Sequence, residues 1–190
     1  PVLHALEGVS NPYALPVDRV IGILGSLGLF PEASEDFMME GFSFTSHVVG
    51  GAFETVDLLF DRDDGGTDKT DEWWQLDPLA GWLLAEPERV PYTCVVPKET
   101  ETYQQPFDVA IYGHGYGSSR VEFLIFSWAM AKVGLAACAM DFPGHGVSLG
   151  QDDEELIVPV LEAAGLLAFL DHLDDSRQAD VDNDGDPDSG

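Results

Sequence analysis

Hydrophobic positions near the start of the chain change from helical spacing to alternation. After Pro16, apolar residues recur about every three to four positions up to Phe30, which predicts a short amphipathic helix ending near Gly28. Residues 38–60 are instead rich in aromatic and β-branched side chains, in two alternating runs separated by Gly50-Gly51. This second pattern predicts a pair of strands.

The middle of the chain contains a stretch without periodicity, followed by two segments whose hydrophobic pattern predicts strands. Residues 61–72 form a polar loop, and the Trp- and Pro-rich stretch up to residue 90 has no clean periodicity, so no element is predicted there. Residues 91–97 predict a short strand. Residues 106–113 are almost continuously apolar, which is typical of a buried, central strand in a parallel sheet.

A helix and a further strand follow that central strand. Ser118 or Ser119 can cap a helix that is apolar nearly all round and ends at Gly134. Residues 135–142 predict the next buried strand. The order of strand, loop, helix and strand predicts an α/β fold with a right-handed crossover. Acidic residues then begin a helix through about Leu173, which Pro159 either kinks or starts.

Composition and charge exclude some classes of function. The 190 residues, 45% of them hydrophobic, suffice for one domain or most of one. Asp and Glu number 35 against 8 Lys and Arg, and the net charge of −27 would repel a phosphate backbone, which excludes nucleic acid as a partner. No apolar run reaches the roughly 18 residues of a membrane span. The sequence begins at Pro1 instead of Met and shows no signal peptide, which favours a processed or engineered form. The acid excess suits a secreted, marine or salt-adapted protein, and the expected location is secreted, extracellular or periplasmic.

Two glycine-rich loops are the candidate sites of chemistry. GHGYGSS (113–119) lies between a predicted strand and a helix, where backbone N–H groups and the helix dipole can form an oxyanion hole. The alternative is a turn that only packs tightly. DFPGHGVS (141–148) follows the next strand. Loops at the carboxyl ends of strands line the ligand crevice of an open α/β sheet, so both loops are expected at the same functional edge.

These two segments resemble the α/β-hydrolase superfamily. IYGHGYGSS is similar to its strand-HGxG-helix segment, and DFPGHGVS to the D-x-x-G-H-G-x-S turn of many esterases and lipases. The resemblance implies the amino-terminal part of an α/β-hydrolase mixed sheet with crossover helices, completed by a missing or separate segment. Residues 1–45 would be helical or irregular, 46–176 the first half of the hydrolase core, and 177–190 an acidic calcium-type loop. More loosely, the chain resembles large secreted bacterial esterases or lipases.

The resemblance also implies roles for single residues. Tyr116, directly after His114-Gly115, would supply one oxyanion-hole N–H, a contribution of roughly 3 kcal/mol. The substrate-binding site would be lined by His114, Gly115, Gly117 and Phe142. His114, His145 and Asp141 would shape the loops rather than transfer protons.

The superfamily's nucleophile elbow, a serine in a sharp turn directly between a strand and a helix, is not recognisable in the sequence. GVSLG (146–150) has the letters of G-x-S-x-G, but its serine comes six residues after the predicted strand 135–142, within the D-x-x-G-H-G-x-S turn. The string LGSLG (24–28) lacks the first glycine and falls on a predicted helix. The triad order of this superfamily is serine, acid and histidine. We therefore expect all three on a complementary chain or downstream segment, which would also cover the apolar edge of the sheet. The expected activity is hydrolysis of a small or polymeric carboxylic ester, with this chain inactive alone.

An acidic tail predicts a calcium site. Alternating carboxylates around Gly185 match a D-x-D-x-D-G loop, with Asp180, Asp182, Asp184, Asp186 and Asp188 as the ligands. A solvated acidic tail is the alternative. Residues 61–72 match the pattern less well. The rival function is therefore a non-catalytic, calcium-dependent binding or structural module.

The remaining candidates have simpler explanations. Lone histidines, among them His47, lack the spacing of a zinc site. Cys94 and Cys138 lie in predicted strands, where a free thiol acts as a small apolar residue; in an oxidising compartment each would pair instead. Trp73 and Trp74 either pack in the core or line an apolar substrate groove.

Overall fold

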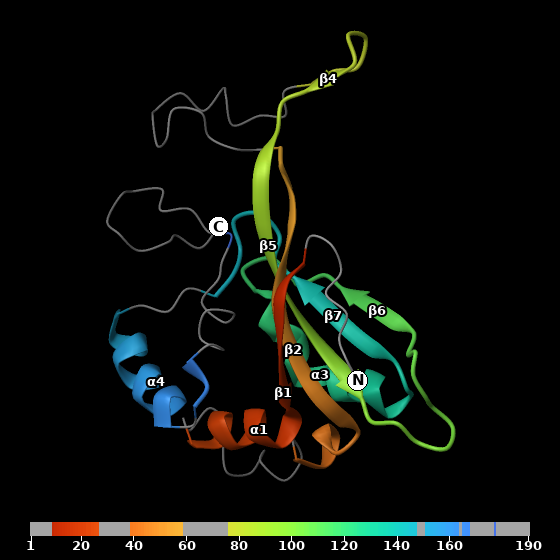
Figure 1. Ribbon diagram of the computed structural model, residues 1–190, viewed down its shortest axis with the longest axis vertical. Helices are drawn as coiled ribbons and strands as arrows, with labels where there is room; N and C mark the ends of the chain where they lie inside the picture. The colour runs from red at the N-terminus through yellow and green to blue at the C-terminus, as the bar shows by residue number, and fades with distance from the viewer. Residues whose placement is uncertain are drawn as a thin grey trace.

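The computed structural model describes residues 9–26, 39–58, 76–147, 151–163, 165–167 and 177. Its centre is a five-stranded sheet in the order β1-β2-β5-β7-β6 (Figure 1). The strands are β1 (Val9–Pro16), β2 (Thr45–Asp57), β5 (Glu86–Pro97), β6 (Val109–Tyr112) and β7 (Ala136–Met140). The helices are α1 (Val17–Ser26), the 3-10 helix η1 (Arg120–Phe123), α3 (Leu124–Lys132) and α4 (Gln151–Ala163).

The sheet is mixed, with mostly antiparallel pairs. Strands β1, β2, β5 and β7 pair antiparallel in that order, and β6 pairs parallel with β7. The parallel pair forms because η1 and α3 lie between β6 and β7 in the chain, and a connection of this length can carry the second strand back in the same direction. An α/β fold is thus confirmed in its broad class, with fewer parallel strands than a doubly wound sheet.

One face of the sheet forms the core. The strand register aligns Leu15, Val48, Val95 and Ala137 across four strands, and none of these side chains is more than 2% exposed. Helices α1, α3 and α4 all pack on this face, through buried apolar residues such as Ile21, Ala131 and Leu161. We call it the covered face.

The opposite face is the open face, defined by the aligned residues Ala14, Val49, Cys94, Cys138 and Ile111. Ile111 is 67% exposed. The sequence predicted that residues 106–113 form a buried central strand, and this is wrong for the described structure. β6 is parallel as predicted, but it lies at the edge of the sheet because β7 returns between β5 and β6.

In place of the predicted pair of strands at 38–60, the structure has a helical turn at residues 39–42 and a single strand, β2. β2 continues through Gly50-Gly51, where Gly50 pairs with both Tyr13 and Thr93. A Cβ at Gly51 would lie 2.6 Å from the Tyr92 hydroxyl. The glycine therefore allows a close approach of Tyr92 instead of marking a turn.

Other predictions agree in part. The first helix is confirmed as α1, whereas the strand predicted at 91–97 begins earlier, at Glu86. The stretch with no predicted element contains the short strands β3 (Leu76–Asp77) and β4 (Trp82–Leu83), which pair beyond the end of β5 (Figure 1). Two-residue strands are too short to show periodicity. None of the helices in the described ranges has the length and apolarity to cross a bilayer.

Glycines end both later helices. After α3, Gly134 has a φ of +77°, and Leu135 N–H donates to Met130 O at 3.0 Å, as the sequence predicted. After α4, Gly165 has a φ of +69°, and Leu166 N–H donates to Leu161 O at 2.7 Å. The predicted continuous helix through Leu173 is therefore wrong, because this glycine ends α4 near Ala163. Pro159 lies inside the helix.

The two cysteines form a disulfide. Cys94 on β5 and Cys138 on β7 are directly opposed, with Cα atoms 4.0 Å apart. Of the two alternatives that the sequence left open, free thiols or pairing, the structure shows pairing of the two cysteines with each other. The pairing could not be predicted from the sequence, because β6 lies between β5 and β7 along the chain although β5 and β7 are neighbours in the sheet.

Candidate functional site

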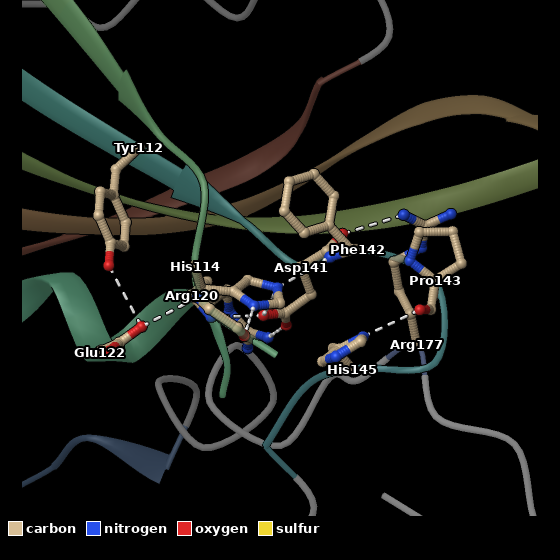
Figure 2. Close-up of polar contacts among 10 residues, drawn as sticks. Tyr112, His114, Arg120, Glu122, Asp141, Phe142, Pro143, His145 and Arg177 are labelled. Carbon is tan, nitrogen blue, oxygen red and sulfur yellow. Dashed lines mark hydrogen bonds and ion pairs between the residues drawn. The ribbon is translucent and has the colours of Figure 1, made fainter. Parts of the chain in front are cut away.

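The two glycine-rich loops meet at the carboxyl edge of β6 and β7 (Figure 2). Parallel neighbours end at the same edge of a sheet, so residues 113–119 and 141–147 come together although a helix separates them in sequence. We call these two loops the first loop and the second loop.

A buried ion pair joins the loops. Asp141 and Arg120 are both 0% exposed. The Asp141 carboxylate accepts the Arg120 backbone N–H on Oδ1 at 2.5 Å and the Arg120 guanidinium on Oδ2. Two charges this deeply buried are tolerable only when they are paired and hydrogen-bonded. The pair fixes the start of η1 to the end of β7.

His114 makes a second link. Its Nε2 accepts the Phe142 backbone N–H at 3.1 Å, and its Nδ1 lies 2.9 Å from Gly115 O. Because a carbonyl oxygen only accepts, Nδ1 carries the proton and the ring is neutral. Both ring nitrogens are therefore occupied, and His114 bridges the loops without a nitrogen left for proton transfer.

The tip of the first loop is a tight turn. Ser118 N–H donates to Gly115 O at 3.2 Å, and Gly117 has a φ of +71°, the positive value that a type II turn needs at its third position. Tyr116 is 91% exposed. In the described part of the chain nothing accepts its backbone N–H. A Cβ at Gly115 would meet open space within 4 Å, so the tip is accessible.

The carboxylate of Glu122 is hydrogen-bonded to the first residue of this turn. Its Oε2 accepts Gly115 N–H at 3.3 Å and the Tyr112 hydroxyl at 3.2 Å. The Gly115 N–H, followed by the Ser118 hydroxyl, lowers the pKa of Glu122, so the carboxylate is ionised at neutral pH. Desolvation and this carboxylate raise the pKa of Tyr112. Tyr112 therefore stays a hydrogen-bond donor.

Aromatic rings gather where the loops meet. The His114 ring lies 4.8 Å from Phe142 and 5.0 Å from His145, and Tyr116 lies 6.0 Å from His145. His145 Nδ1 lies 3.0 Å from Pro143 O, to which it donates. The structure thus brings together Tyr116, His114, Gly115, Gly117 and Phe142, the residues that the sequence predicted for the site.

As with Arg120 and Glu122, sequence reasoning missed Arg177. Its guanidinium binds both carboxylate oxygens of Glu88 on β5, at 2.5 and 2.7 Å, and donates to Asp141 O at 2.9 Å. Its backbone N–H donates to His145 O at 3.0 Å, and its carbonyl accepts Gly144 N–H at 2.9 Å. Arg177 therefore fixes the second loop to β5. The available signal was its position as the lone cation in an acidic run.

The predicted metal ligands lie outside the described residues. This applies to Asp180, Asp182, Asp184, Asp186 and Asp188, to the acidic loop 61–72, and to Trp73 and Trp74. Where the structure does describe the chain, no group of three or more His, Cys, Asp and Glu side chains could hold a metal ion.

Comparisons with known proteins give one distant likeness. No protein-family model matches the sequence, and no curated protein sequence matches it. Among solved structures, the chain is similar to a cold-adapted esterase from an Arctic intertidal metagenomic library, determined as a PEG-bound complex. The two share 16% identity with a TM-score of 0.27, over 66% of this chain and 46% of the esterase. The chain thus spans about half the length of that protein, and a likeness this distant does not define a function.

Proposed function

We propose that this chain is the amino-terminal part of a serine-dependent carboxylic-ester hydrolase and that its first loop supplies an oxyanion-hole donor. The observation that carries the proposal is Tyr116, a residue that is 91% exposed and whose backbone N–H has no acceptor among the described residues. It lies at the carboxyl edge of a parallel strand pair, where α/β proteins bind ligands.

The strand order supports the same proposal. β2, β5, β7 and β6 lie side by side in that order, β5 runs antiparallel to its neighbours, and β7 returns between β5 and β6. This order agrees with the amino-terminal half of the α/β-hydrolase sheet. In that fold the next strand would add beside β6, whose Val109 and Ile111 are 57% and 67% exposed.

The chemistry assigned to this chain is stabilisation of charge. Attack of a serine on an ester carbonyl produces a tetrahedral oxyanion, and fixed N–H donors stabilise it by roughly 3 kcal/mol each. Tyr116 N–H would be one donor, and the N–H after the serine the other. Glu122 holds the Gly115 N–H, which leaves Tyr116 to face the oxyanion. His114, Gly115, Gly117 and Phe142 would line the substrate.

The serine, acid and base are proposed to lie on a complementary chain or downstream segment. The G-x-S-x-G string of the sequence, GVSLG (146–150), belongs to the D-x-x-G-H-G-x-S turn and does not directly follow a strand, since β7 ends at Met140. The exposed apolar side chains of β6 favour a further strand at that edge. The Cys94–Cys138 disulfide favours an oxidising compartment, and we propose a secreted, extracellular or periplasmic location.

Calcium is proposed as the bound ion of the tail. Arg177, which is held against the second loop, comes three residues before Asp180 in the sequence, and the alternating carboxylates that follow match a calcium loop. Calorimetric titration with Ca²⁺ tests this proposal. We expect binding to be lost in the Asp180→Asn/Asp184→Asn double variant and kept in a Glu99→Gln/Glu101→Gln control; equal binding by both variants would exclude this loop.

The oxyanion role can be tested at one atom. Tyr116→Pro removes the backbone N–H and suits the second position of a type II turn, whereas Tyr116→Ala removes only the ring. In the assembled hydrolase we expect Tyr116→Pro to lower kcat on p-nitrophenyl acetate by about 10²- to 10³-fold with little change in KM. Tyr116→Ala should keep most of the activity. Wild-type kcat in Tyr116→Pro would contradict the assignment.

A fluorophosphonate probe tests the class of enzyme separately. Intact mass spectrometry should find the label on a polypeptide segment outside residues 1–190. If no segment of the purified assembly reacts, the hydrolase proposal fails and a calcium-dependent binding or structural module takes its place.

A further inference from the structure

A cavity of about 650 Å³ lies away from the two loops, on the open face. Its floor is apolar and comes from four strands, with Ala14 on β1, Val49 on β2, Val96 on β5 and Ala136 on β7. Phe107 from the loop before β6 adds to it. The volume falls within the range of pockets that bury small ligands.

The wall beside this apolar floor is a loop, residues 98–107, that is held by several hydrogen bonds. Thr100 Oγ1 accepts the backbone N–H groups of Thr102 and Tyr103 at 3.2 and 2.9 Å, and Thr100 N–H donates to Tyr103 O at 2.8 Å. Lys98 N–H donates to Phe44 O at 2.8 Å. These bonds fix the wall relative to the sheet, so the groove is preformed.

Lys98 gives the groove a positive group. Within the described ranges its ammonium makes no ion pair, whereas each of the other described cations has an interaction. His47, which also lines the groove, adds a polar imidazole. Glu99 lines it too, but its Oε1 accepts Gln105 N–H at 3.4 Å. In a chain of net charge −27, an unpaired lysine beside an apolar floor is a distinctive combination.

We propose that this groove binds an amphiphilic monocarboxylate, with the acyl chain on the apolar floor and the carboxylate at Lys98. Apolar burial would supply most of the affinity, and the charge would set the orientation. The groove is separate from the loops, because Ala136 begins β7 and Asp141 follows its end. Five residues at about 3.3 Å each place them roughly 16 Å apart. The inference therefore does not depend on the proposed hydrolase function.

Decanoate is a suitable probe, and amide chemical shifts locate its site. We expect shifts to concentrate at Val49, Val96 and Ala136, with Tyr116 and Phe142 unchanged. Lys98→Gln should weaken decanoate binding roughly tenfold and leave binding of decanol unchanged. Lys132→Gln makes the same charge change outside the groove, on α3, and should bind decanoate like the wild type.

A second variant tests the floor. Ala14 is exposed, so Ala14→Phe fills the groove without disturbing the core, and it should abolish decanoate binding while the circular dichroism stays unchanged. The proposal is overturned if millimolar decanoate causes no shifts, if the shifts fall at the two loops, or if Lys98→Gln and Lys132→Gln weaken binding equally. Shifts that depend on protein concentration instead of decanoate would assign the groove to a second copy and also overturn it.

Discussion

The carboxyl edge of β6 and β7 and the open face of the same sheet are stabilised by different forces. At the carboxyl edge, directional polar bonds from Arg120, His114 and Arg177 fix the two loops. The open face instead presents apolar side chains such as Ile111, with the Cys94–Cys138 disulfide as its covalent link. Directional bonds define the position of backbone atoms, whereas an apolar face gains stability only when it is covered. The difference predicts where a substitution is costly.

The largest effect is expected at the carboxyl edge, from Asp141→Ala. This change leaves the buried Arg120 charge without its carboxylate, which costs about 3–5 kcal/mol. Urea denaturation measures the loss. Glu101→Ala removes an exposed carboxylate and serves as the control. If both variants unfold at the same urea concentration, the buried pair does not stabilise the loops.

A smaller loss is expected from Cys94→Ala/Cys138→Ala. The disulfide closes a loop with a sequence separation of 44, and its removal should lower the free energy of unfolding by about 2–4 kcal/mol. Reductant should destabilise the wild type and leave the variant unchanged. Alkylation of two free thiols in the unreduced, denatured protein would show that the bond is absent.

Glu122→Gln removes the carboxylate charge that is hydrogen-bonded to the first loop, and the pH dependence of stability tests its contribution. Hydrogen bonds hold the pKa of Glu122 below its usual value of 4.5, so its charge stabilises the folded state above pH 4.5. That contribution is lost as the pH falls through the lower, folded-state pKa. The wild type should therefore exceed the variant in stability at neutral pH, and the two should converge in acid. A stability difference that is constant with pH would contradict the assignment.

The smallest effect is expected on the open face, from Val109→Thr. Val109 is 57% exposed, so this nearly isosteric change should alter stability by less than about 0.5 kcal/mol. Val95→Thr is the matched change on the covered face. Val95 is 0% exposed, and a hydroxyl buried there should cost about 1–3 kcal/mol. Equal losses would mean that β6 is covered in solution.

The sequence predicted elements well where one local pattern dominates. The helix ending at Gly134 and the strand after it were found because an apolar run and a glycine stop are local signals. β2 was mistaken for two strands, since only its partner Tyr92 explains Gly51. The edge position of β6 and the Cys94–Cys138 bond follow from strand order, which a local pattern does not contain.

The candidate site was likewise predictable only where a local pattern marks it. The first loop and the second loop were recognisable from their glycines and from the strands before them. The links between them were not, because Arg120, Glu122 and Arg177 have no motif and gain partners only when the chain folds. The calcium ligands stay a prediction.

Arg177 has a consequence for cleavage of the chain. It binds Glu88 through its side chain and residues 144 and 145 through its backbone, so it is held from both directions. A protease that cuts once between residues 168 and 176, after α4, would therefore leave two fragments that remain associated. Such a nicked protein should migrate as one species on a native gel and as two under denaturing, reducing conditions. Arg177→Ala should let the carboxyl-terminal fragment dissociate after the same cut.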